Sequence, residues 1–89
     1  MIDCQELKMV TWLDITSQTE PWIDVVEAKE MKPAKMITLG WIVKETHEFI
    51  TLASTLDAEE ELVGDVNCIP RPAILSIIHL SVIDSAVED

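Results

Sequence analysis

Residues 36–45, Met-Ile-Thr-Leu-Gly-Trp-Ile-Val-Lys-Glu, are the stretch that decides the fold. Apolar residues alternate along it and place four side chains on one face: Ile37, Leu39, Trp41 and Val43. This period of two, with β-branched and aromatic residues, indicates a strand. Gly40 lies in the middle, and a glycine inside a strand marks a sharp bend or the close approach of another backbone segment. The stretch therefore predicts a long, bent strand.

Four further strands are predicted around it, over residues 9–15, 48–56, 62–69 and 73–80. A short turn at Thr46 and His47 joins residues 36–45 to residues 48–56 as a hairpin. Between the first two strands, residues 20–30 have apolar side chains at helical spacing. Ser17 or Thr19 can cap that helix and Pro21 suits its first turn, so one short helix is expected there.

The segment 69–73, Ile-Pro-Arg-Pro-Ala, is predicted to be a one-turn connector, because two prolines fix φ and remove backbone donors. Together the elements predict a mainly β fold: a small, five-stranded, partly open barrel with one short helix in its N-terminal half. The 89 residues form one domain, with a loose lead-in over residues 1–8, the barrel over residues 9–80 and an acidic tail over residues 81–89.

The composition narrows the class of protein further. A hydrophobic fraction of 48% and a mean hydropathy of +0.23 favour a packed core over a disordered chain. No apolar run approaches the roughly 18 residues that would span a membrane, and the first residues do not resemble a secretory leader. The two cysteines fit a reducing compartment. A cytoplasmic protein without a membrane partner is expected.

Acidic residues dominate the charge, which is −11 at pH 7. This balance excludes wrapping of a polynucleotide, because each phosphate contact needs a cation. Five acids cluster in one region: Asp57, Glu59, Glu60, Glu61 and Asp65. Residues 66–83 contain no acid and include the only arginine, Arg71, between Pro70 and Pro72. A small anion could bind at this connector despite the overall charge.

Three segments give the chain a resemblance to small uncharacterised bacteriophage proteins: Trp12-Leu13-Asp14, Gly40-Trp41-Ile42-Val43, and Ile69-Pro70-x-x-Ala73-Ile74. The match spans roughly residues 9–80 and implies a role in the cytoplasm of an infected bacterium. The strand order also resembles Sm-like and Src-homology-3-like barrels. Their Ile-Arg-Gly-x-x-Ile connector is similar to residues 69–74 here, with the arginine displaced by one position and the glycine absent.

The Sm-like resemblance implies assembly into a ring through the edges of the fourth and fifth strands. Residues 73–80 support an oligomer independently, because this strand is apolar on both faces and one core covers only one of them. We therefore expect a homo-oligomer. In a ring, Arg71 would recur once per subunit around a shared cavity.

Catalytic and metal-binding patterns are weak. His47, His79, Cys4 and Cys68 do not show the close spacings of a zinc site, and Cys68 is expected to be a small buried residue. Ser76 and His79 lie three apart on a strand and face opposite sides, and the two glycines form no phosphate-binding loop. We expect no enzyme activity, no metal and no cofactor.

The three tryptophans are the remaining candidates for binding. Trp41 is expected in the core, whereas Trp12 and Trp22 are either partly exposed, to stack on a base or anchor a partner, or buried, with Trp22 holding the helix to the barrel. The predicted ligand site comprises Arg71, Trp12, Trp22, Pro70 and Pro72.

Two functions follow, and a structural or assembly component is the third alternative. The first is a non-enzymatic protein that counteracts host defence by sequestering a small nucleotide signal in an oligomer cavity. The second is an acidic interaction module that mimics nucleic acid and inhibits a basic host protein through the cluster of five acids.

Overall fold

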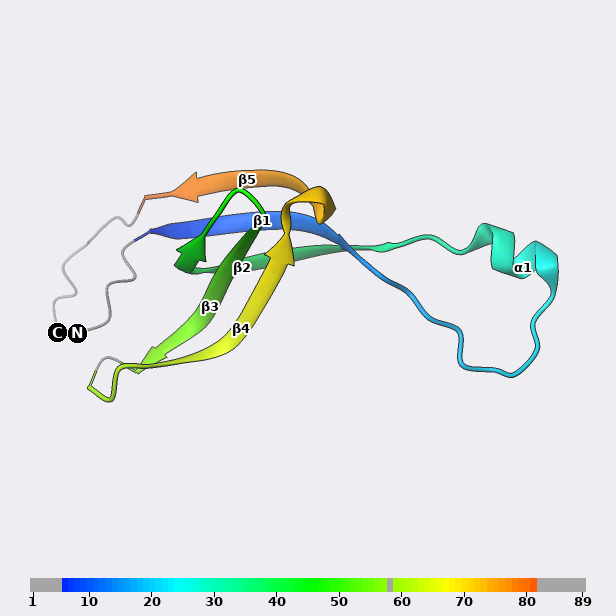
Figure 1. Ribbon diagram of the computed structural model, residues 1–89, viewed down its shortest axis with the longest axis horizontal. Coiled ribbons are helices and arrows are strands. Elements are labelled where there is room, and N and C mark those ends of the chain that lie inside the picture. The colour runs from blue at the N-terminus through cyan, green and yellow to red at the C-terminus, as the bar shows by residue number, and fades with distance from the viewer. Residues whose placement is uncertain (1–5, 58, 82–89) are drawn as a thin grey trace, which may run out of the picture.

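The computed structural model describes residues 6–57 and 59–81, and it is dominated by strands. Its elements are β1 (Leu7–Asp14), α1 (Val25–Glu30), β2 (Ala34–Glu45), β3 (Phe49–Asp57), β4 (Leu62–Pro70), the 3-10 turn η1 (Arg71–Ala73) and β5 (Ile74–Leu80). The strands form one antiparallel sheet in the order β4-β3-β2-β1-β5. Among the described residues β4 and β5 do not pair with each other, so the sheet stays open (Figure 1). The mainly β fold with five strands and one short helix is confirmed.

Strand β2 is long because it pairs with two neighbouring strands along different parts of its length. It pairs with β1 from Ala34 to Trp41 and with β3 from Trp41 to Glu45. Gly40 lies at this changeover, where a Cβ atom would stand 2.8 Å from the Ala53 carbonyl oxygen. A real side chain cannot approach a backbone atom so closely without a shift of the strands. The close approach expected at Gly40 is therefore present.

The core is small and lies on one face of the sheet. Its fully buried members are Val10, Ile50, Leu52 and Ile69. On β2 the side facing this core holds Thr38, which accepts a hydrogen bond from the Trp12 indole at 2.9 Å, and Ile42. The more apolar face predicted from the sequence points the other way, and Ile37 is 66% exposed. Trp41 is half-buried and lies outside the core cluster, so its assignment to the core was wrong.

The two tight connections formed as predicted. At the β2–β3 turn, the Thr46 hydroxyl accepts hydrogen bonds from the backbone N–H groups of Glu48 and Phe49, both at 3.1 Å. After β4, the 3-10 turn η1 reverses the chain, with Pro70 before it and the Ile74 N–H donating to the Arg71 carbonyl. This turn carries β5 across to the edge of β1.

Three local predictions were wrong. Strand β1 begins at Leu7, so Lys8 belongs to the sheet and not to a lead-in. The helix begins at Val25, because the Asp24 carboxylate caps it by accepting from the Val26 N–H at 3.1 Å, and residues 20–24 stay outside it. Cys68 is exposed rather than buried. The predicted tail lies outside the described residues from position 82 onward.

An arm projects from the sheet between β1 and β2, and we define it as residues 13–35 (Figure 1). There β1 and β2 pair only with each other, because the β1–β5 pairing ends at Trp12. The chain has a radius of gyration of 17.6 Å, against about 12 Å for a compact domain of this length. No helix in the described part of the chain is long and apolar enough to cross a membrane.

Candidate functional site

Arg71, the centre of the predicted anion site, is held by the neighbouring turn. Its Nη2 donates to a Glu45 carboxylate oxygen at 2.8 Å and its Nε donates to the Thr46 carbonyl at 3.1 Å. Its backbone N–H donates to the Glu48 carbonyl at 2.9 Å. Arg71 therefore fastens η1 to the β2–β3 turn, and a bound phosphate would compete with Glu45 for the guanidinium.

Glu45 has a second cationic partner that the sequence analysis missed. Lys8 Nζ lies 2.8 Å from the other Glu45 oxygen and 3.5 Å from Glu6, and Lys8 is only 4% exposed. The hydrogen bond from Lys8, followed by that from Arg71, lowers the pKa of Glu45 below its ordinary value. The carboxylate thus bridges β1, β2 and η1. No sequence motif predicts these ion pairs, because residues 8, 45 and 71 are brought together only by the β1–β2 register and the connector.

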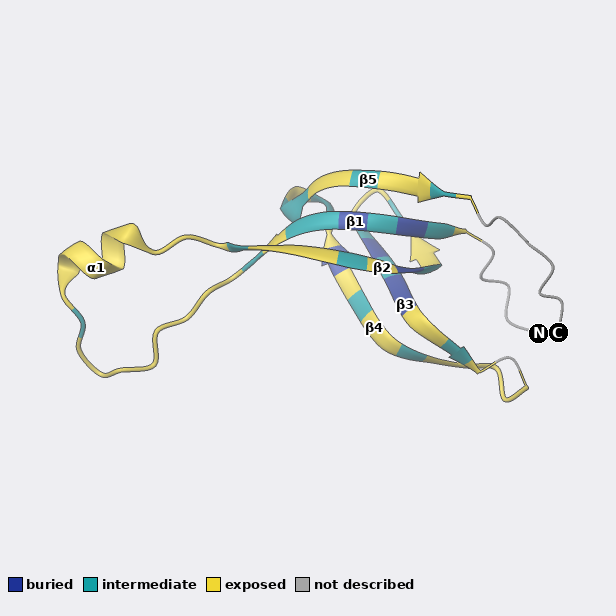
Figure 2. Cartoon of the chain, turned by 180° about the vertical axis from the view of Figure 1, so that it is seen from behind, coloured by how far each residue is buried: buried dark blue, intermediate teal, exposed yellow. Residues whose placement is uncertain are grey.

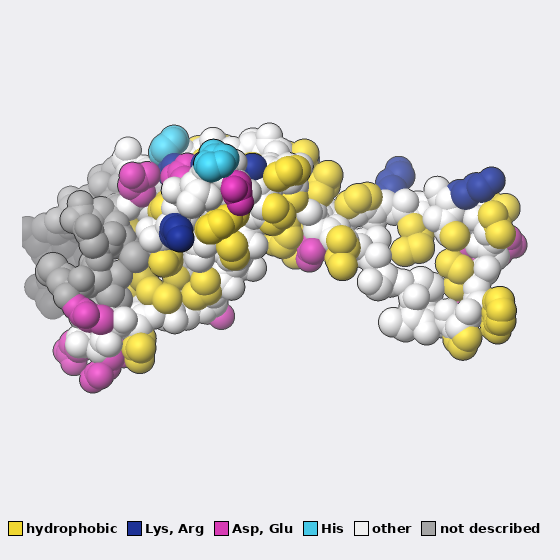
Figure 3. Space-filling model, in the orientation of Figure 1, with side chains coloured by type: hydrophobic (Ala, Val, Ile, Leu, Met, Phe, Trp, Pro, Cys, Tyr) yellow, Lys and Arg dark blue, Asp and Glu magenta, His cyan; other side chains and the backbone are white. Residues whose placement is uncertain are grey.

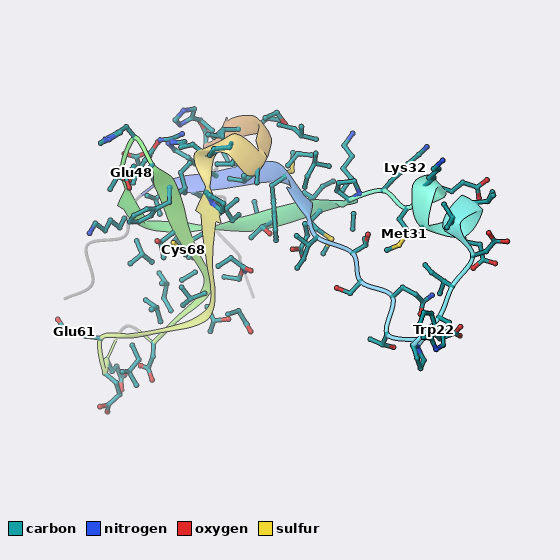
Figure 4. All side chains as sticks on the ribbon, turned by 45° about the vertical axis from the view of Figure 1, so that its right-hand side comes forward. Trp22, Met31, Lys32, Glu48, Glu61 and Cys68 are labelled. Carbon is teal, nitrogen blue, oxygen red and sulfur yellow. The ribbon has the colours of Figure 1, made fainter. Side chains whose placement is uncertain are left out.

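The other predicted ligand residues divide between the sheet and the arm. Pro70 and Pro72 flank Arg71 and are exposed, while Trp12 is half-buried and pairs with Ile74, directly after η1. Trp22 stands far away on the arm and is 90% exposed (Figure 4). The structure brings four of the five residues to one end of the sheet, and a single copy does not add Trp22 to them.

The predicted acidic cluster surrounds the β3–β4 hairpin. The Asp57 carboxylate accepts hydrogen bonds from the backbone N–H groups of Glu59 and Glu60, at 3.2 and 3.1 Å. Asp65 lies in β4 with a φ of 52° and accepts from the Thr55 hydroxyl at 3.3 Å. Glu61 also belongs to the hairpin. Acidic side chains gather at the end of this hairpin, away from the arm (Figure 3).

An apolar surface covers the side of the sheet opposite the core. Residues directly opposite each other in an antiparallel pair share a face, so the β5–β1–β2 register builds two apolar rows. We call these residues the outer strip: Ile78, Met9 and Leu39 in one row, Leu80, Leu7 and Trp41 in the next. Leu39 is 50% and Ile78 47% exposed. The predicted apolarity of both β5 faces is the sequence signal for this surface.

The arm continues this apolar character beyond the sheet. It exposes these large side chains: Leu13, Ile15, Trp22, Val25, Val26 and Met31. None of the six α1 residues is buried, and the arm is exposed along almost its whole length (Figure 2). In Figure 3 apolar side chains extend from the sheet along the arm. Trp22 therefore does not hold the helix to the sheet.

The geometry defines an open five-stranded β-sheet protein with an exposed apolar arm. In the part of the chain that the structure describes, no three His, Cys, Asp or Glu side chains are grouped to hold a metal ion. No protein-family model, no curated protein and no solved structure matches the chain. The function is therefore inferred from the surfaces alone.

Proposed function

We propose that this chain is a non-enzymatic protein-interaction module that binds its partner through the arm. The observation that carries the proposal is the exposure of apolar side chains with no core behind them, above all Trp22 at 90% and Ile15 at 84%. Contiguous exposed apolar surface on a small domain marks an interaction site. Tryptophan is also the residue type most enriched among the anchors of protein interfaces.

The local energetics support binding by the arm. A six-residue helix without buried side chains is marginal in water, and so is a two-stranded ribbon without a third strand. Burial of one large apolar side chain contributes about 1.5–3 kcal/mol. A partner that covers Trp22, Val25 and Val26 would therefore both order the arm and gain affinity from it.

The proposal is tested by capture of partners with a paired variant. Trp22→Ala combined with Val26→Ala removes two anchors at positions 90% and 62% exposed, and neither residue belongs to the sheet. We expect this variant to retain fewer proteins than the wild type from the same extract. Glu27→Gln with Glu30→Gln is the matched control on the same helix and is expected to bind like the wild type. Equal retention by the Trp22 variant would contradict the proposal.

Sequestration of a small defence nucleotide stays a prediction with narrower support. Arg71, Pro70, Pro72 and the edge of Trp12 do lie at one end of the sheet. The guanidinium, however, is already bonded to Glu45 and to the Thr46 carbonyl. A calorimetric titration with cyclic and ADP-ribose-type nucleotides would show binding that Arg71→Ala abolishes if this function is correct.

An acidic mimic of nucleic acid is a second candidate, favoured by the exposed acids at the β3–β4 hairpin, Asp57, Glu59 and Glu60. Such a surface would bind a basic protein in a salt-sensitive manner. Glu59→Gln with Glu60→Gln should weaken that binding, whereas Glu27→Gln with Glu30→Gln removes the same charge from the arm and should not. Equal effects of the two pairs would contradict a role for the hairpin.

A further inference from the structure

The basic residues of the described chain fall into two groups that differ in their partners. Three bases are engaged: Lys8 and Arg71 by Glu45, and Lys44 over the Phe49 ring at 5.7 Å. The other three, Lys29, Lys32 and Lys35, make no ion pair within the described residues. They lie close together where the arm returns to β2, and we call residues 29–35 the basic segment.

The β3–β4 hairpin carries a charge opposite to that of the basic segment. Like the arm, it also exposes apolar side chains. Asp57, Glu59 and Glu60 are exposed and make no ion pair within the described chain. Immediately beside them β4 exposes Leu62 (60%), Val63 (38%) and Val66 (48%). We call residues 57 and 59–66 the acidic hairpin. The basic segment carries three lysines against one acid, Glu30, and lies on an apolar arm, so this segment and the hairpin are complementary in charge and both expose apolar side chains.

One copy of the chain cannot bring these surfaces together. The arm and the acidic hairpin extend from the sheet in different directions (Figure 1), and the longest dimension of the molecule is 58 Å. Each surface is therefore exposed on a chain that also carries its complement. This arrangement favours a second copy over an unrelated protein as the occupant.

We propose that two copies of this chain pair in antiparallel fashion, each arm lying on the acidic hairpin of the other copy. The basic segment faces the hairpin carboxylates, and Trp22, Val26 and Met31 pack against the exposed face of β4. A two-fold axis repeats the same contact twice and closes the assembly. The inference rests on the proposed function, because it names the partner of the arm.

Charge reversal tests the pairing directly. Lys29→Glu with Lys32→Glu reverses two charges of the basic segment, and Glu59→Lys with Glu60→Lys reverses two carboxylates of the hairpin; Asp57 is left in place because it caps the turn. Sedimentation equilibrium of the full chain should show a dimer for the wild type and a dissociation constant raised at least about tenfold for either variant. An equimolar mixture of the two variants should recover the dimer, because in both contacts residues 29 and 32 then face residues 59 and 60 of opposite charge.

Control variants separate the proposed pairing from the proposed function of the arm. Glu48→Lys reverses an exposed charge at the β2–β3 turn and should leave dimerisation unchanged, and circular dichroism establishes that each variant is folded. The pairing would be overturned by a monomeric wild type. It would also be overturned if neither charge reversal raised the dissociation constant of the dimer. If the wild type is monomeric and Trp22→Ala with Val26→Ala still loses its captured partners, the pairing fails and the proposed function stands.

Discussion

Lys8 and Glu45 form an ion pair of 2.8 Å in which the lysine is buried, at only 4% exposure, and the Glu45 side chain is 31% exposed. Glu45→Gln would leave that ammonium without a full counter-charge and would also weaken the hold on Arg71. Removing the Glu45 carboxylate is costly because the charge of the buried Lys8 stays desolvated. We expect a loss of about 2 kcal/mol in the free energy of unfolding, measured in urea.

Two further variants check the origin of that loss. Lys8→Met removes the buried charge itself, and since Glu45 keeps Arg71 we expect it to cost less than Glu45→Gln. Glu48→Gln changes an exposed carboxylate three residues away and should stay within about 0.5 kcal/mol of the wild type. A Glu45→Gln protein as stable as the Glu48→Gln protein would show that the pair contributes nothing.

The same pair predicts a pH dependence. The pKa of Glu45 is lowered by the hydrogen bond from Lys8 and then by that from Arg71. Its stabilising contribution is therefore complete above its ordinary value of 4.5 and is lost as the pH falls through the lower pKa of the folded state. We expect the stability difference between wild type and Glu45→Gln to shrink as the pH is lowered below 4.5. A constant difference across that range would contradict the shift.

The sequence predicted those parts of the fold that depend on local chemistry. Alternating apolar residues located all five strands, and the two prolines around Arg71 predicted the turn η1. The helix was placed five residues too early, because Ser17, Thr19 and Pro21 are also typical of helix starts, whereas Asp24 forms the cap. Because several neighbouring residues can cap a helix, the local sequence does not decide at which of them the helix begins.

The candidate surfaces were harder to predict because they depend on register. Which face of β2 meets the core is set by pairing with β1, and that pairing places Thr38 opposite Val10, so the more apolar face lies outside. The role of Arg71 depends on Glu45, which is 26 residues away in the chain. Exposure of Trp22 depends on the arm leaving the sheet, which periodicity does not reveal.

The two glycines make a matched pair for a test of backbone packing. Alanine at Gly40 would bring its Cβ within 2.8 Å of the Ala53 carbonyl oxygen and 3.2 Å of the Leu52 Cβ, so the β2–β3 contact must open. We expect a loss of about 1–3 kcal/mol in urea unfolding. Alanine at Gly64 meets nothing nearer than the Thr55 Cβ at 3.6 Å and should be neutral or slightly stabilising. Equal effects of the two substitutions would argue against a close approach at Gly40.

The tryptophans Trp12 and Trp22 should separate stability from binding. Trp12 packs against the core and donates to the Thr38 hydroxyl, so Trp12→Ala leaves a cavity and an unpaired acceptor. We expect it to cost about 3 kcal/mol. Trp22 is 90% exposed, and at concentrations where the chain is monomeric Trp22→Ala should stay within about 0.5 kcal/mol of the wild type. Urea unfolding followed by circular dichroism measures both variants without relying on the deleted fluorophore.

Fluorescence quenching adds an independent readout of the same difference. In the wild type acrylamide should quench a component of the tryptophan emission that disappears in Trp22→Phe and persists in Trp12→Phe, because only the indole on the arm is open to solvent. Binding of a partner to the arm should protect that component. A Trp22→Ala chain that unfolds more readily than Trp12→Ala would mean that the arm packs on the sheet within one copy, and the arm could then not serve as a free docking surface.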